Sequence, residues 1–312
     1  MGDLMHALPA LTEAKEHIEN ISFDWVVDKN FSSVPSWHPV VDNIITTDHR
    51  NWKKQLFSRN SRASLRDAVS QINKSNYDLV LDMQNNLKSA FISYLSKHDV
   101  VGMDAKSARE YPAHLAYSKK IYVDKELHAI ERQKKLLGKA LGYDYTKNYV
   151  NYGASFNSFI KPNINLPDNY FVLVQNASWV TKQWSIKKWQ QLIQVLEDKG
   201  IDMLLPSGNL EELDRAKEIC SISNKAQAID LMPLNEIAYI IKNADFCICS
   251  DTGLAHLSAL TGTPSITLYG PTKISLIGTN GLNQKHLIGD NEDINQITVS
   301  DVISELDRNY IS

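Results

Sequence analysis

The sequence has few cysteines and no long apolar run, and both absences narrow the class of protein. Its three cysteines, Cys220, Cys247 and Cys249, lack the spacing of a disulfide framework, which favours a reducing compartment. Cys247 and Cys249 alternate with Ile248 in an apolar stretch, so we interpret them as small core residues. No apolar segment approaches the roughly 20 residues that span a bilayer, and no signal peptide is recognisable. We therefore expect a cytosolic protein, which is compatible with binding to a membrane surface.

Strong charge of one sign is also lacking. A net charge of −3 over 312 residues argues against nucleic-acid binding by the molecule as a whole. No Asp-x-Asp pair follows a predicted strand and no cluster of His and Cys occurs, so neither a metal nor any other cofactor is predicted. The acidic residues Asp290, Glu292 and Asp293 follow Gly289 in a polar stretch, and we expect them to be solvated.

The length favours two domains. In the second half, predicted strands alternate with predicted helices, which indicates a doubly wound parallel α/β sheet. These strands are 170–174, 202–205, 226–229, 246–249 and 266–268, and the helices are 185–199, 211–220 and one opened by Pro233. The first half also combines predicted strands and helices, less regularly. The strands are 23–27, 43–46, 79–81 and 100–102, and the helices are 12–18, 64–73 and 128–141.

Ser, Asn, Gly and Pro gather between residues 153 and 166, which predicts a linker there. We place the domains at 1–155 and 156–312. A last helix is expected from about Ser300, as its N-cap, to Asn309, and whether it packs back on the first domain is left open.

The most informative segment is the turn that follows the apolar strand 246–249. Asp251, Thr252, Gly253 and Leu254 stand where a strand gives way to a helix, and backbone N–H groups at such a helix start bind phosphate. A second turn, Gly270-Pro271-Thr272, follows the next strand. Two such turns at neighbouring strand ends predict a nucleotide-binding crevice. His256 lies one helical turn further on, and we favour an ordinary helix histidine there over a ligand.

Several ordered motifs resemble one family. They are Gly2-Asp3 with residues 6–11, the 251–257 turn and the 268–272 segment. Together they resemble the bacterial ADP-heptose:lipopolysaccharide heptosyltransferases, which are inverting glycosyltransferases. The segments 23–27, 35–38, 102–110 and 128–132 are most similar to the heptosyltransferase I branch.

The resemblance implies a GT-B fold, in which two Rossmann-like domains face each other across a cleft. It also implies a first strand ahead of Met1 that this sequence does not contain. The implied reaction moves heptose from ADP-heptose to a Kdo sugar of Kdo-lipid A during lipopolysaccharide inner-core synthesis. It would take place at the cytoplasmic face of the inner membrane. The alternatives are heptosyltransferase II or another sugar-nucleotide transferase, a truncated non-catalytic nucleotide-binding paralogue, and a sugar-nucleotide epimerase.

On the acceptor side, Asp3 by itself resembles a helix N-cap, whereas the resemblance makes it the general base. A basic stretch with interleaved apolar residues follows at 50–66, and it suits either a solvated face or an anionic lipid. The acceptor-binding candidates in the first domain are Arg50, Lys53, Lys54 and Arg109.

On the donor side, the resemblance gives Ser178 and Lys182 to the diphosphate, with Lys182 neutralising the leaving group. The family has a His-Ala-Thr-Thr-like sequence where this chain has residues 175–178, which weakens the assignment of Ser178. Glu212 is predicted either to bind ribose or to favour a helix start, and Met232 either to pack near the adenine or to fill the core.

Overall fold

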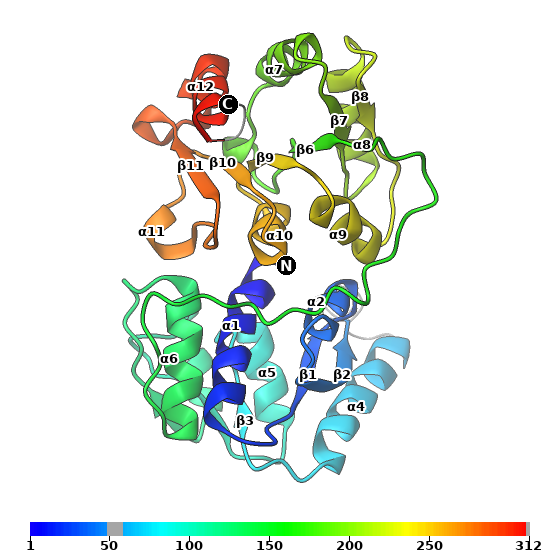
Figure 1. Cartoon of the computed structure of the whole chain (residues 1–312). Helices are drawn as coiled ribbons and strands as arrows, with labels where there is room; N and C mark the ends of the chain where they lie inside the picture. The colour runs from blue at the N-terminus through cyan, green and yellow to red at the C-terminus, as the bar shows by residue number, and fades with distance from the viewer. Residues whose placement is uncertain (49–58, 310–312) are drawn as a thin grey trace. The chain divides into compact units, whose positions relative to one another are not determined.

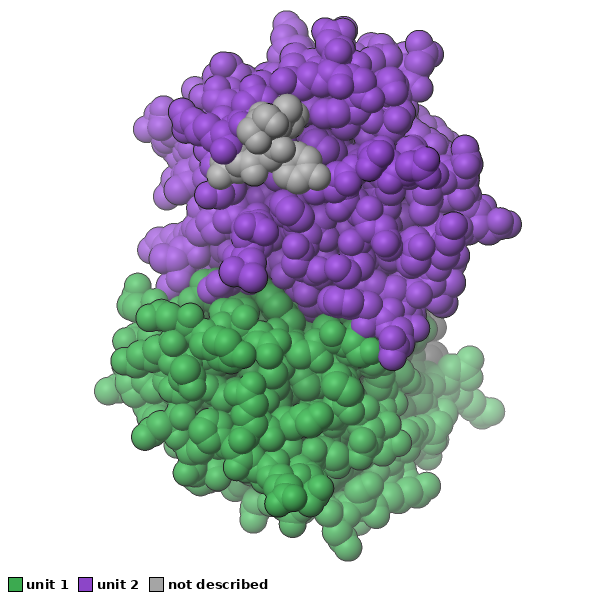
Figure 2. Space-filling view, viewed as in Figure 1, with its two compact units in different colours: residues 1, 3–155 green, residues 2, 156–312 purple. Residues whose placement is uncertain are grey.

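The computed structural model describes residues 1–48 and 59–309. The chain forms two compact units (Figure 2). Unit 1 consists of Met1 and residues 3–155, and unit 2 consists of Gly2 and residues 156–312. Both units combine parallel strands with helices (Figure 1), so the α/β prediction is confirmed.

Unit 2 is built on one parallel sheet of six strands in its described part, in the order β11-β10-β9-β6-β7-β8. The inner strands β6 and β9 are buried along their whole length, because helices cover both faces of a parallel sheet. All five predicted strands are confirmed, whereas β11 was not predicted because Gln284, Lys285 and His286 give it no apolar run. The strands are β6 (Tyr170–Val174), β7 (Asp202–Leu205), β8 (Ala226–Ala228), β9 (Phe246–Ser250), β10 (Ser265–Tyr269) and β11 (Gln284–Ile288).

The helices of unit 2 pack an apolar face on this sheet. In α7, Trp189, Leu192 and Ile193 are fully buried, as the helical spacing predicts. The helices are α7 (Ile186–Asp198), α8 (Leu210–Cys220), α9 (Leu234–Lys242), α10 (Gly253–Thr261), α11 (Ile274–Ile277) and α12 (Val299–Asn309), with 3-10 turns η3 (Val180–Lys182), η4 (Asp290–Glu292) and η5 (Ile294–Gln296).

The last helix differs in one detail from its prediction. Ser300 is not its N-cap, because α12 already begins at Val299. Thr298 takes that role: its hydroxyl accepts from the backbone N–H of Asp301, and the Asp301 carboxylate accepts from the N–H of Thr298. The buried face of α12, with Val302 and Leu306, belongs to the core of unit 2.

Unit 1 contains two separate parallel sheets in its described residues, β1–β2 and β3–β4–β5. The predicted strands are confirmed, and β5 was not predicted because two lysines leave it a single apolar residue. The strands are β1 (Phe23–Asp28), β2 (Val41–Thr47), β3 (Val80–Leu81), β4 (Val100–Met103) and β5 (Lys119–Ile121).

Helix α1 joins the two sheets of unit 1. Its residues Leu11 and Ala14 belong to one apolar cluster with Trp25 of β1 and Leu81 of β3. The helices are α1 (Gly2–His17), α2 (Ser33–Ser36), α4 (Arg59–Lys74), α5 (Leu87–Leu95) and α6 (Ala129–Leu141), with 3-10 turns η1 (Lys29–Phe31) and η2 (Ala113–Ala116). Helix α5 was not predicted.

The end of unit 1 packs closely on its own core. Gly153 has a φ of +59°, and a Cβ there would lie 2.3 Å from Thr12 Oγ1 and 2.8 Å from His38 Nε2. Only glycine fits both the backbone conformation and the space. The backbone N–H of Ser155 donates to the carbonyl of Trp37 at 2.6 Å. Beyond this point, in unit 2, the N–H of Ile160 donates to the carbonyl of Asn235 at 3.2 Å.

Within residues 1–48 and 59–309, no helix has the length and apolar character needed to cross a membrane. The three cysteines are buried free thiols, as expected for core residues. Burial raises the pKa of the Cys220 thiol to about 12 and that of Cys247 well above its ordinary value, so both stay protonated and unreactive.

Candidate functional site

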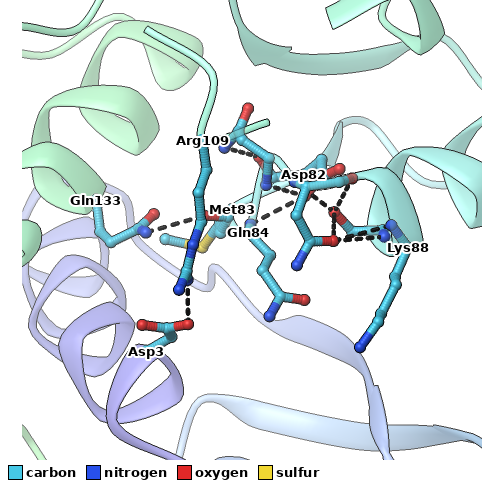
Figure 3. Close-up of polar contacts among 10 residues, drawn as sticks. Asp3, Asp82, Met83, Gln84, Lys88, Arg109 and Gln133 are labelled. Atoms are coloured by element: carbon cyan, nitrogen blue, oxygen red, sulfur yellow. Dashed lines mark hydrogen bonds and ion pairs between the residues drawn. The ribbon is translucent and has the colours of Figure 1, made fainter. Parts of the chain in front are cut away.

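In unit 1 the candidate base Asp3 lies in the first turn of α1, and Met1 is the N-cap. The N-cap interpretation of Asp3 is therefore wrong. The exposed Asp3 carboxylate accepts a hydrogen bond from Arg109 Nη1 and forms an ion pair with it (Figure 3). The structure thus brings together two residues that the sequence proposed separately, one as base and one as acceptor ligand.

The backbone of Arg109 is held by Asn85, a buried residue with a φ of +53°. The Asn85 carbonyl accepts from the N–H groups of Arg109 and Glu110 at 3.1 and 3.3 Å. Its side chain accepts from the N–H of Met103 at 2.6 Å and donates to the carbonyl of Asp82 at 2.8 Å. One asparagine therefore connects the turn after β3, the end of β4 and the segment that carries Arg109.

The buried carboxylate of Asp82 fixes the same turn. It accepts from the backbone N–H groups of Gln84 and Asn85, both at 2.9 Å, and from the Tyr117 hydroxyl at 2.7 Å. Burial raises the pKa of Tyr117, and the negative charge of Asp82 raises it further, so the phenol remains a donor. Gln133 Nε2 donates to the Met83 carbonyl at 2.9 Å (Figure 3). The turn is consequently rigid on its buried side.

The exposed side of this turn carries Gln84 and Lys88, and Figure 3 shows both side chains extending away from the buried carboxylate of Asp82. Lys88 follows Asn86, which caps α5 through its side chain. Burial lowers the pKa of Arg132, and the nearby charge of Arg109 lowers it further, while Asp124 raises it. Gln84 was missed from the sequence, although its position just after a predicted strand was the available signal.

In unit 2 three candidate residues meet at the carboxyl ends of neighbouring strands. Lys182 Nζ lies 2.6 Å from Asp251 Oδ2, and the Thr272 hydroxyl donates to the same oxygen. Lys182 follows β6, Asp251 follows β9 and Thr272 follows β10, and these strands are adjacent in the sheet. The arrangement matches the position at which open α/β sheets bind nucleotides.

The turn 251–254 connects a strand to a helix start, β9 to α10, as predicted. Thr252 is the N-cap of α10, and its side chain makes no capping hydrogen bond. The first N–H groups of the helix, at Gly253 and Leu254, have no acceptor within the helix because no earlier turn provides one. His256 is buried in the same helix. This turn can hold an anion through its backbone.

Glu212 takes part in a helix cap. Its carboxylate accepts from the Gly208 N–H at 2.8 Å and from Asn209 Nδ2 at 3.0 Å, while Asn209 accepts from the Glu212 N–H. The helix-start interpretation is therefore correct. The ribose-binding role stays a prediction, since each carboxylate oxygen can accept a second hydrogen bond.

Two buried polar atoms near Glu212 were missed from the sequence. Asn176 Oδ1 and Ser207 Oγ have no hydrogen-bond partner among the described residues, and Asn176 Nδ2 reaches the Glu212 carbonyl only at 3.5 Å. They follow the neighbouring strands β6 and β7. Buried polar atoms are nearly always paired, so a water or a ligand hydroxyl is expected there.

Where the structure describes them, the remaining candidate residues have no contact that indicates a role. Ser178 is exposed in the loop between β6 and η3, and Met232 is half-buried just before Pro233. Arg50, Lys53 and Lys54 lie outside the described residues. Among residues 1–48 and 59–309, no group of His, Cys, Asp and Glu side chains is arranged to hold a metal.

The chain matches a known protein family over most of its length. The model of glycosyltransferase family 9 (heptosyltransferase) matches residues 65–303. The chain belongs to the family 9 heptosyltransferases. This heptosyltransferase is 38% identical to lipopolysaccharide heptosyltransferase 1 of Escherichia coli K12 over 91% of its own length and 89% of that protein.

Two solved structures of E. coli heptosyltransferase WaaC resemble it over 99% of its length and 96% of theirs. The structure with ADP gives a TM-score of 0.91 at 35% identity. The structure with ADP-2-deoxy-2-fluoro heptose gives a TM-score of 0.88 at 34% identity.

Proposed function

We propose that this heptosyltransferase transfers heptose from ADP-heptose to a Kdo sugar of Kdo-lipid A, at the cytoplasmic face of the inner membrane. The observation that carries the proposal is the Lys182–Asp251 pair, with Thr272, at the ends of three adjacent strands. A cation next to a helix start suits a diphosphate leaving group. WaaC structures hold ADP and a fluorinated ADP-heptose analogue, which supports the same donor here.

On the donor side, the bond from the anomeric carbon to the diphosphate oxygen breaks, and ADP leaves with the electron pair. The N–H groups of Thr252, Gly253 and Leu254 hold the diphosphate, and Lys182 neutralises its growing charge. Asp251 keeps the Lys182 ammonium in place before the donor binds, since the two are in contact. Ser178, Glu212, Met232 and His256 complete the donor site in this proposal.

On the acceptor side, Asp3 takes the proton of the attacking Kdo hydroxyl as the new bond forms on the opposite face of the sugar. In the free enzyme the Asp3 carboxylate is held in an ion pair with Arg109. A Kdo carboxylate that binds the Arg109 guanidinium would release Asp3 from this ion pair and free its oxygens to accept the hydroxyl proton. Arg50, Lys53 and Lys54 bind the remaining anionic groups of the acceptor.

The test is the replacement Asp3→Asn, which keeps the shape of the side chain and removes the base. We expect kcat to fall about 100-fold to 10,000-fold, which is the usual contribution of general-base catalysis. Calorimetric binding of ADP should be unchanged, because the donor residues lie in unit 2. The matched control is Asp42→Asn, at an exposed aspartate of β2. Near-normal turnover in Asp3→Asn would overturn the assignment of the base.

A further inference from the structure

An apolar stripe lies exposed along helix α5. Leu87, Phe91 and Tyr94 are spaced by four and three residues, so they share one face of the helix. Leu87 and Phe91 are about half-exposed, at 49% and 47%, and Tyr94 is 76% exposed. Ala90 and Ile92 are buried on other sides of the helix. A helix with apolar residues on both its buried and its exposed faces has a second surface to cover.

Two neighbouring residues extend this stripe. Tyr111 is 76% exposed and Leu115, in η2, is 69% exposed. Helix α5 and η2 are in contact, and the Leu87 N–H donates to the Glu110 carboxylate at 2.9 Å. The five residues Leu87, Phe91, Tyr94, Tyr111 and Leu115 therefore form one surface of unit 1, which we call the α5 patch.

The charges around the α5 patch are mixed. Helix α5 carries Lys88 and is followed by Lys97, while the exposed Glu110 binds the Leu87 N–H and the exposed Asp99 lies just beyond Lys97. A groove on unit 1 next to the end of α5 is lined by Leu65, Arg66, Val69, Lys74, Leu95 and Lys97, and no acidic residue lines it. A large exposed apolar surface beside several cations is complementary to an anionic lipid bilayer.

We propose that the α5 patch docks on an anionic lipid bilayer, with Phe91, Tyr94, Tyr111 and Leu115 at the level of the lipid head groups. Aromatic side chains suit this depth, because the ring is apolar and a tyrosine hydroxyl stays hydrated. Apolar burial and basic charge together give the two signals that stable attachment needs. The proposal rests on the proposed function in one respect: Tyr111 follows Arg109 by two residues, so docking would bring lipid head groups near the acceptor site.

The test measures binding of the whole chain to vesicles of phosphatidylcholine, with and without phosphatidylglycerol, by co-sedimentation. The variant Phe91→Ser/Tyr94→Ser/Leu115→Ser should lower the partition coefficient on the mixed vesicles about tenfold or more, since two rings and a leucine leave the bilayer. The matched control is Leu282→Ser/Ile288→Ser, at two exposed residues of unit 2, 83% and 64% exposed, and it should bind as the unaltered chain does.

Two results would overturn the proposal. One is unchanged vesicle binding by the patch variant. The other is a concentration-dependent dimer of the unaltered chain that the variant loses in sedimentation velocity, because a second copy would then cover the patch. Single replacements, led by Tyr94→Ser, decide the matter if the triple variant fails to fold. Vesicle binding is measured without substrate, so a failure of the proposed transferase reaction would not affect this result.

Discussion

The two units use the same α/β pattern but hold their strands together differently. In unit 2 each of the inner strands β9 and β6 pairs with a strand on both sides, and their residues are completely buried. In the described part of unit 1 the strands fall into two sheets, and β1 and β3 each pair with one strand only. Helix α1 packs across both sheets. Strand pairing therefore organises unit 2, whereas helix packing has to organise unit 1.

The buried side chains of the two units also differ. The largest buried side chains of unit 2 include Trp184 and Trp189, whose rings meet edge to face at 5.2 Å. Unit 1 buries Trp37 just as fully, and it also buries a charged group. Lys134, 1% exposed, lies 4.0 Å from Glu13 and 3.8 Å from Glu131, and donates to the carbonyls of Thr146 and Tyr149. We therefore expect the stability of unit 1 to depend more on specific polar contacts than that of unit 2. Single substitutions can test this difference.

The largest effect is expected from Lys134→Ala. It leaves Glu13 buried without its cation, so unit 1 should lose about 3–5 kcal/mol of stability. Amide hydrogen exchange should show faster exchange in α6 and α1 and unchanged exchange in β6 and β9. The control Lys135→Ala alters the next lysine of α6, which is only partly buried, and should have little effect. Equal loss of protection in both units would show that they unfold together and would remove the contrast.

A smaller effect is expected from acid. Burial, with a contribution from Lys15, lowers the pKa of His38 from 6.5 to about 4. His38 Nδ1 accepts from the Val40 N–H, and Nε2 faces the Thr12 hydroxyl at 3.0 Å, which suits a neutral ring. The unfolded chain binds this proton more readily. Its contribution is therefore complete above pH 6.5 and is lost as pH falls towards 4, with about 2 kcal/mol lost between about pH 7 and about pH 5.

Exchange rates in unit 1, measured at these two pH values, test this expectation. His38→Gln removes the titrating group, so the variant should show a weaker dependence on pH in β1 and α1. Unit 2 serves as the internal reference. An identical pH dependence in the variant and the unaltered chain would assign the acid sensitivity to other groups.

The smallest effect is expected at the start of α12. Thr298→Ala removes a hydroxyl that accepts from the Asp301 N–H and should cost about 1 kcal/mol. Ser300→Ala, two residues on and inside the helix, should cost little. Thermal unfolding followed by circular dichroism compares the two variants. A larger cost at Ser300 than at Thr298 would contradict the cap seen in the structure.

The sequence predicts unit 2 better than unit 1 for a physical reason. Buried parallel strands appear as short apolar runs between turns, and β6 and β7 match their predicted limits. Helix α5 escaped prediction because Leu87, Phe91 and Tyr94 are apolar residues on an exposed face, which hides the usual helical periodicity. Strand β5 and strand β11 escaped because edge strands need few apolar residues.

The candidate site shows the same limit. Asp251 and Lys182 were each identifiable from their local motifs, but 69 residues separate them and no local pattern reveals their contact. The same holds for Asp3 and Arg109, which are 106 residues apart. Asn176 and Ser207 became noticeable only when burial showed that their polar atoms lack protein partners.

The contacts of Asn85 have a consequence for anyone designing inhibitors. Because one buried asparagine sets the backbone that carries Arg109, the Arg109 backbone in unit 1 is already shaped before any substrate arrives. The Arg109 guanidinium is held by the Asp3 carboxylate, and in unit 2 the Lys182 ammonium is likewise held by the carboxylate of Asp251. Under the proposed function, a compound that copies the acceptor's carboxylate has to compete with Asp3 for a guanidinium whose backbone is already positioned, and a nucleotide mimic has to compete with Asp251 for the Lys182 ammonium group.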